Sequence, residues 1–410
     1  MFNMPLFDYS FLSKILPKAK IKKGFRKAKK SYLNRVRLAT SLFFFGMGFC
    51  FSTWASRIPD IKSALQLSEA ALGTMLFALP IGQLLAMPFS GNIVTRYGSR
   101  TISILGLFLY ALCLTFLGLA TASWQLAVGL LLFGFFGNFC NIAVNTQGVY
   151  TQQLFDKPII GSFHGSWSLA GFCGALTGLL MLAIELSPFQ HFTVAFGFVI
   201  VILLTNYKFM IKVKSKPTAE KSTYSFWKNP DKTLLWVGVV CFCGMASEGI
   251  MFDWSGVYFK EVIQAPGALV VLGYTTFMIS MASGRFLSDL LVARYGSKKV
   301  LIVSGIVISL GLYMAVLLPF MIPCTIAFML VGFGVSNVVP IIFNVAGNTK
   351  NVPTGIALTI VTSISFLGFL IGPPLIGYIA ELTNLKYSFA LIGLFGLLIS
   401  LLVSRLKIFN

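Results

Sequence analysis

Twelve apolar stretches, each long enough to cross a lipid bilayer, constrain the fold of this chain more than any other feature. A membrane-spanning helix needs roughly 20 apolar residues, because the hydrocarbon core is about 30 Å thick. Charged residues make up only 11% of the chain, too few to cover the surface of a soluble protein. We therefore predict an all-α membrane protein with twelve transmembrane helices. The predicted spans are approximately 38–57, 70–90, 101–121, 124–147, 161–184, 192–210, 233–258, 268–290, 300–319, 322–345, 355–379 and 386–405.

The second half of the chain repeats features of the first at offsets of 197 to 200 residues. Four features recur in the same order: Trp54 as Trp254, Arg96-Tyr-Gly-Ser99 as Arg294-Tyr-Gly-Ser297, Asn145 as Asn344, and Gly171-Phe172 as Gly368-Phe369. Repeated apolar segments are typical of transporters whose binding site lies where the two repeats meet. We predict two pseudo-symmetric six-helix bundles. The predicted parts are a basic tail at 1–37, bundles at 38–210 and 233–410, and a polar linker at 211–232.

The net charge of +20 is sorted along the chain in a way that predicts topology. If the N-terminus is cytoplasmic, only four of the 32 Lys and Arg residues fall outside the cytoplasmic segments: Arg57, Lys62, Lys260 and Lys386. This bias places both termini in the cytoplasm and argues against nucleic-acid binding. The tail fits a solvated or lipid-contacting segment, with regulation or partner binding as the alternative. The first apolar run lacks a convincing cleavage site, so we interpret it as a retained span.

The sequence gives no indication of catalysis or metal binding. All seven cysteines lie in apolar runs without metal-ligating neighbours, where they fit as small packing residues. The chain has no phosphate-binding loop, no HExxH and no GxSxG motif, and its two histidines, His164 and His191, are far apart in sequence. We predict that the protein is not an enzyme and uses no catalytic residue, cofactor or metal.

Two short loops carry the repeated basic signature. The loop after the second span reads Gly91-Asn-Ile-Val-Thr95-Arg96-Tyr-Gly98-Ser-Arg100, and the segment after the eighth runs from Gly284-Arg285 through Asp289 to Arg294. Both resemble motif A of the major facilitator superfamily, Gly-x-x-x-Asp-Arg-x-Gly-Arg-Arg. Thr95 replaces the motif's Asp in the first copy, and the second copy has a longer spacing. The resemblance implies that a latch closes the cytoplasmic side in the outward-open state, with topology-setting charge as the alternative. The latch candidates are Arg96, Arg100, Asp289 and Arg294.

Four further segments resemble a bacterial inner-membrane branch of this superfamily, of the YbjJ type. They are Trp54-Ala-Ser-Arg57-Ile-Pro59, Phe163-His164-Gly-Ser-Trp167, Glu248-Gly-x-x-x-Asp253-Trp254 and Gly372-Pro-Pro-Leu-Ile-Gly377. Fucose–proton symporters are more distant relatives. The resemblance implies a transporter of the bacterial inner membrane that works as a monomer. Members of the branch often have carboxylates in the fourth span, where this chain has Asn141 and Gln147.

Two acids, Glu248 and Asp253, lie clearly within a predicted span. Ionisable groups inside a bilayer are costly and usually face a cavity or a partner. Glu248 is the deeper and the first proton-coupling candidate, because a buried carboxylate can exchange a proton near neutral pH; a structural hydrogen bond is the alternative. Asp253 lies about 7 Å further outward and faces about 140° away. It is the next proton-coupling candidate, and it could also pair with Arg57 and gate the outer side, unless Arg57 pairs with Asp60.

The substrate-binding candidates are amides and tryptophans. Asn138, Asn141 and Asn145 share one face of the fourth span, and Gln147 follows closely. Amides both donate and accept hydrogen bonds, which suits a neutral hydroxylated or amide-bearing solute; helix–helix contact is the alternative. The other candidates, for which packing is the alternative, are Asn337, Asn344, Trp54, Trp167 and Trp254. His164 could couple protons or gate the cytoplasmic side, unless it is only a structural hydrogen-bonding residue.

We predict that the chain moves a small organic solute by alternating access, coupled to protons. Symport is favoured because the polar face of the fourth span suits a hydrophilic solute. Proton-driven efflux is the alternative, and a lipid carrier or a non-transporting membrane sensor are further ones. The Gly-rich fifth and eleventh spans should let helices approach closely, and Pro373-Pro374 should interrupt the helical hydrogen bonds there.

Overall fold

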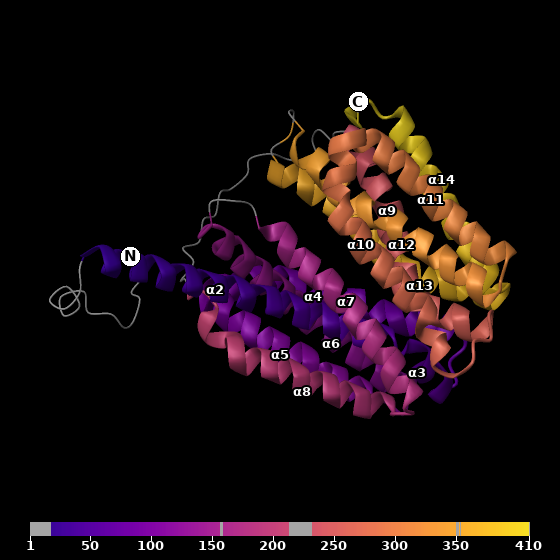
Figure 1. Ribbon diagram of the computed structural model, residues 1–410. Coiled ribbons are helices and arrows are strands. Elements are labelled where there is room, and N and C mark those ends of the chain that lie inside the picture. Colours follow the sequence, from indigo (N-terminus) through magenta and orange to yellow (C-terminus); the bar gives the residue numbers. More distant parts are fainter. Residues whose placement is uncertain (1–17, 156–158, 213–231, 350–351, 353, 410) are drawn as a thin grey trace.

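The computed structural model describes residues 18–155, 159–212, 232–349, 352 and 354–409, and their regular structure is helical throughout (Figure 1). The N-terminal bundle contains α2 (Lys18–Ala55), α4 (Glu69–Tyr97), α5 (Ser99–Leu117), α6 (Ser123–Gln152), α7 (Ile160–Ala183) and α8 (Pro188–Asn206). The C-terminal bundle contains α9 (Lys232–Glu261), α10 (Leu272–Tyr295), α11 (Ser297–Leu317), α12 (Met321–Gly347), α13 (Thr354–Leu382) and α14 (Leu385–Arg405). Short helices are α3 (Ile58–Ala64), η1 (Tyr207–Phe209), η2 (Gly267–Val271) and η3 (Lys407–Phe409).

The prediction of twelve transmembrane helices is confirmed, since 12 helices of the described chain are long and apolar enough to cross a membrane. The largest difference concerns α2, which has 38 residues and begins at Lys18, inside the predicted tail. At 1.5 Å per residue such a helix is about 57 Å long, well beyond the bilayer core, so its basic first turns extend past the hydrocarbon. Most of the predicted linker, residues 213–231, and the first 17 residues lie outside the described part of the chain.

The repeated Arg-Tyr-Gly-Ser tetrad has a local structural cause. Gly98 and Gly296 end α4 and α10 with φ angles of 84° and 80°, a region that side chains with a Cβ rarely adopt. Their N–H groups donate to the carbonyls of Val94 and Val292, each at 2.9 Å. Each glycine therefore closes one helix and starts the next within a single residue. The same turn occurs at the same place in both bundles.

The two bundles contact each other mainly along two helix pairs, α4 with α13 and α7 with α10. The close approach expected for the eleventh span occurs where Gly73 of α4 faces Pro373 and Pro374 of α13. In Figure 1 the ribbons of the two bundles converge near α3 and separate toward the opposite end. We call these the α3 end and the termini end, because α2 begins and α14 finishes at the latter.

Candidate functional site

An ion pair with a buried acid joins α9 and α10 of the C-terminal bundle. Arg285 of α10 donates from Nη2 to Oε1 of Glu248, in the middle of α9, at 2.7 Å. The Glu248 side chain is only 6% exposed, whereas that of Arg285 is 22% exposed. Removing one partner of a buried pair leaves a charge without its counterion, which costs about 3–5 kcal/mol. Each of the two residues therefore depends on the other to keep its charge inside the membrane.

Arg285 also connects the two bundles. Its Nη1 donates to Oγ of Ser168 in α7 at 2.8 Å, and its guanidinium lies 5.7 Å from the ring centre of Trp167. We call Glu248, Arg285, Ser168 and Trp167 the central cluster. The bond from Arg285 to Ser168 joins the bundles at a level well away from the α3 end. Trp167 was a substrate-binding candidate, with packing as the alternative, and the structure places it against this cation.

Aromatic rings border the central cluster on the side of the α3 end. Phe252 follows Glu248 by four residues, about 6 Å further along α9. Its ring contacts Trp167 at 6.4 Å, Phe51 of α2 at 5.1 Å and Phe369 of α13 at 6.2 Å between ring centres. These contacts join helices of both bundles. They place an apolar wall directly beside the two charges of the central cluster.

Arg57 does not pair with Asp253. It pairs with Asp60, three residues away, which is the alternative given by the sequence. The guanidinium of Arg57 donates to Asp60 at 2.7 Å, to the Leu186 carbonyl at 2.8 Å and to Nδ1 of His191 at 3.2 Å. All of these residues belong to the N-terminal bundle, so Arg57 ties the corner of α2 and α3 to α8. Asp253 is partly exposed, and in the described structure its carboxylate has no hydrogen-bond or ion-pair partner.

The α3 end is closed by polar contacts that the sequence analysis did not identify as a site. Lys62 of α3 bonds to Glu69 at 3.2 Å and to Glu261 of the C-terminal bundle. Lys260 donates to the Pro59 carbonyl at 3.1 Å. The charge pattern of the sequence had predicted that Lys62 and Lys260 lie on the opposite side of the membrane from most other basic residues. That sorting was a usable signal for a gate at this end.

The amides of α6 are mostly bonded within their own bundle. Asn138 accepts from Ser90 at 2.7 Å, and Asn145 donates to the carbonyl of Asn141 one turn earlier at 2.8 Å. Gln147 is buried, and its amide bonds to Ser99 and to both backbone groups of Ile211, each at 2.8 Å. Gln147 therefore holds the end of the bundle together in this conformation. Only Asn141 of this set is exposed.

The other amides and tryptophans fall into two groups. Trp54 and Trp254 are 1% and 0% exposed, and neither indole N–H has a partner among the described residues. Asn337 is also buried, and its Nδ2 donates to the Phe333 carbonyl at 3.2 Å. Asn344 is exposed and accepts from Asn348 one turn later at 2.8 Å, as Asn141 does from Asn145. The two bundles thus repeat an Asn pair, displaced by about one helical turn from the repeat offset.

The predicted latch residues lie at the termini end. The guanidinium groups of Arg96 and Arg294 lie over the rings of Tyr97 and Tyr295, at 5.5 and 5.4 Å. Arg100 lies 6.0 Å from the ring centre of Tyr207. Asp289 belongs to α10, but its side chain is outside the described part of the structure.

His164 lies near the start of α7, with its ring 5.3 Å from that of Phe44 in an edge-on contact. It precedes Ser168 by one turn, and the Ser168 hydroxyl donates to its carbonyl at 3.2 Å. His164 is therefore linked to the central cluster through its backbone, and the residue is exposed.

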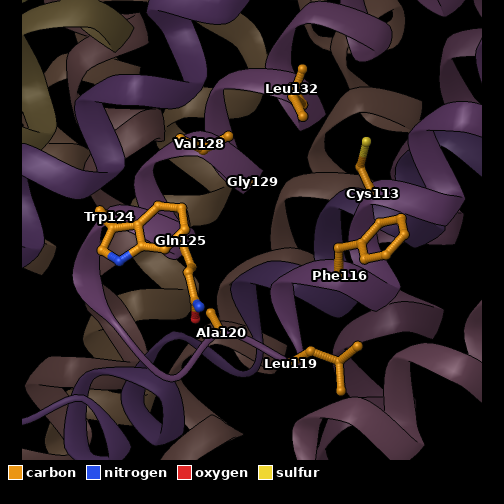
Figure 2. A pocket seen from close by; sticks show the side chains of 9 residues that line it. All are labelled: Cys113, Phe116, Leu119, Ala120, Trp124, Gln125, Val128, Gly129 and Leu132. Atoms are coloured by element: carbon orange, nitrogen blue, oxygen red, sulfur yellow. The ribbon is translucent and has the colours of Figure 1, made fainter.

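A hollow of about 290 Å³ lies elsewhere, between α5 and α6 toward the α3 end (Figure 2). Its wall is largely apolar, and exposed side chains such as Trp124 (67%) and Phe116 (58%) form its rim. Figure 2 shows Gln125 as the one amide among these side chains. The hollow shares no residue with the central cluster.

The helix arrangement and the repeated turns agree with comparisons to known proteins. The family model described as Major Facilitator Superfamily matches residues 38–353 and 274–408. The chain belongs to the major facilitator superfamily. It is 32% identical over 358 residues to an uncharacterized MFS-type transporter of Yersinia pestis, covering 87% of this chain and 92% of that protein. The resemblance inferred from the two motif A loops is thus confirmed.

Solved structures share the superfamily fold. A point mutant of the nucleoside transporter NupG has a TM-score of 0.77 at 12% identity, covering 91% of this chain and 100% of that chain. The fucose:proton symporter FucP of E. coli has a TM-score of 0.58 at 17% identity, covering 91% of this chain and 98% of that chain. These identities show a common fold only.

Proposed function

We propose that this secondary transporter couples the movement of a small organic solute to protons, as a symporter of the bacterial inner membrane. The observation that carries this proposal is the ion pair of Glu248 and Arg285, which reaches across to Ser168. Ionisable residues in transmembrane segments mark ion and substrate pathways. The fold, which is shared with a fucose:proton symporter, is compatible with this mode of coupling.

The conformation supports alternating access. Polar contacts between the bundles gather at the α3 end, through Lys62 and Lys260. If the basic residues mark the cytoplasmic side, the α3 end faces outward and is closed. The described conformation then has its opening toward the cytoplasm. Transport requires that the contacts at the α3 end break while the termini end closes.

Glu248 is the proposed proton carrier. When it binds a proton it loses the charge that holds Arg285, so protonation changes the mid-membrane polar link that joins α9, α10 and α7. Asp253 is the second acid of the same helix and has no cation partner among the described residues. Asp253→Asn is therefore the next variant to test if Glu248→Gln still accumulates solute.

The test uses proteoliposomes with an imposed inward proton gradient and a panel of sugars, nucleosides and small carboxylates. Glu248→Gln should lose accumulation driven by the gradient, yet keep exchange of labelled for unlabelled solute. Glu185→Gln, at an exposed acid between α7 and α8, is the matched control and should behave as the wild type. Uphill accumulation retained by Glu248→Gln would exclude it as the carrier. Accumulation only under an outward proton gradient would indicate efflux.

A further inference from the structure

We propose that the central cluster is a carboxylate-binding site and that the transported solute is a small organic anion that crosses with one proton. This inference names the substrate class of the proposed symporter and rests on that function. It replaces the neutral solute that the amides of the fourth span had suggested.

Arg285 has more donors than its described partners use. A guanidinium carries five N–H groups in a rigid plane, and here Nη1 and Nη2 each donate to one protein oxygen. Its side chain is 22% exposed, while Glu248 behind it is 6% exposed. A solute therefore reaches the cation before it reaches the acid. The planar fork of Arg matches the two oxygens of a carboxylate better than it matches a hydroxyl.

The charges around this pair are few. The helix α12 has no charged residue, α13 has Glu381 near the α3 end, and α14 has charges only at its two ends. The facing helix α7 contributes His164 and no acid. On α9 itself, Asp253 lies five residues from Glu248. On α10, Asp289 follows Arg285 by one turn, and its side chain lies outside the described structure. Among the described residues at this depth, Arg285 is thus the cation for which a solute anion and Glu248 compete.

Charge balance then couples the anion to a proton. Before binding, the positive Arg285 and the negative Glu248 sum to zero. If a solute carboxylate takes the guanidinium, Glu248 remains without a counterion in a medium of low dielectric constant, where an isolated charge is costly. One proton from water converts its carboxylate to the neutral acid, and the sum is zero again. A neutral solute would leave the ion pair intact and would not bring a proton.

The neighbouring rings indicate an organic anion. Trp167 lies against the Arg285 guanidinium, and Phe252 contacts Trp167 on the side of the α3 end. The body of a carboxylate held by Arg285 would lie beside these rings, which favour apolar or ring-bearing groups. The amides of α6 offer less to a neutral solute than the sequence suggested. Asn138 and Asn145 already bond within their own bundle.

The experiment is a thermal-shift and binding measurement on the detergent-purified full chain. The probes are matched pairs that differ at the carboxylate: glucuronate and glucose, benzoate and benzamide, lactate and propane-1,2-diol. Carboxylates should stabilise the protein, and their neutral counterparts should not. Glu248→Gln should bind the carboxylate at least tenfold more tightly, because the internal competitor is gone, and its affinity should depend less on pH.

Changing Arg285 should have the opposite effect. Arg285→Lys should weaken carboxylate binding, since it keeps the charge but loses the fork. The double variant Arg285→Gln/Glu248→Gln removes both charges, so it leaves no unpaired buried ion and should fold without binding the carboxylate. Lys299→Gln, at an exposed cation outside the central cluster, is the matched control and should bind as the wild type.

Three results would overturn the inference: equal stabilisation by neutral counterparts, no stabilisation by any carboxylate, or weaker carboxylate binding by Glu248→Gln. Flux measurements separate this inference from the proposed function. If neutral solutes accumulate with the proton gradient, the symport function stands and the anion site is wrong. If carboxylates bind at Arg285 but do not accumulate, the anion site stands and the symport function is wrong.

Discussion

Gly73 lies at a tight contact between the bundles at the α3 end, and adding one methyl group there should open that end. A Cβ at this position would lie 2.7 Å from the Pro373 carbonyl oxygen and 3.1 Å from Cα of Pro374, whereas ordinary contacts begin at 3.4 Å. Both obstacles are backbone atoms of α13, so no side chain can rotate away. The bundles must separate by several tenths of an ångström for Gly73→Ala to be accommodated.

The magnitude follows from overpacking, which costs typically about 1–3 kcal/mol. Because the contact crosses between the bundles, the strain is present when the α3 end is closed and is relieved when it opens. A difference of about 1–3 kcal/mol changes a two-state ratio by roughly 5–150-fold. Gly73→Ala should therefore shift the population toward the conformation that is open at the α3 end.

Spin-label distances would measure this shift, in a background without the seven native cysteines. Labels at Ala64 and Thr383 report on the α3 end, and labels at Asn92 and Ala293 report on the termini end; all four positions are exposed. Gly73→Ala should lengthen the first distance and shorten the second. The control is Gly91→Ala in the same helix, where a Cβ meets no atom within 4 Å. Identical distributions for both variants would refute the reasoning.

Three further outcomes follow from the structure. Lys62→Gln leaves Glu69 and Glu261 without their shared cation, so the same labels at the α3 end should move apart. The free energy of the closed conformation relative to the open one should rise by roughly 1–2 kcal/mol, given the partial exposure of the acids. An unchanged distance would show that Lys62 does not hold the α3 end closed. Gln147→Leu deprives both Ile211 backbone groups of their partner and should lower the stability of the protein by about 1–3 kcal/mol. The measurement is the melting temperature in detergent, which should fall. An unchanged melting temperature would contradict the stabilising role of Gln147. A single cysteine at Glu185 should react with an impermeant thiol reagent added outside cells, and one at Ser215 should not; the reverse pattern would overturn the topology.

The spans and the repeat could be predicted because they depend on local sequence. A window of about 20 apolar residues identifies a transmembrane helix wherever its neighbours lie. The turns at Gly98 and Gly296 likewise need only a residue that tolerates positive φ. The extra length of α2 could not be predicted from hydropathy, because its first turns are polar and lie outside the apolar stretch. A helix continues past the bilayer wherever water can solvate its side chains.

The partners of polar side chains could not be predicted in the same way. Arg285 was visible in sequence as part of the second motif A segment, near the predicted end of the span at residue 290. In the structure α10 continues to Tyr295, so Arg285 lies ten residues, about 15 Å, from that end of the helix. Its bonds to Glu248 and Ser168 depend on how three helices pack. An Asn at a four-residue spacing, such as Asn145, likewise bonds to its own helix or to a solute, and spacing alone does not decide between them.

The two levels at which the bundles meet have different consequences for transport. From Glu248 to Glu261 along α9 the rise is about 20 Å, so the central cluster and the Lys62 contacts lie far apart along the bundle. When two bundles rock against each other, displacement grows with distance from the pivot. Contacts at the α3 end must therefore break, whereas a link close to mid-membrane, such as that from Arg285 to Ser168, moves least and can persist in both states. A contact that is present in both conformations does not by itself favour one of them over the other. The coupling then has to come from a change in what Arg285 holds, and the exchange of Glu248 for a solute carboxylate supplies that change without breaking the link between the bundles.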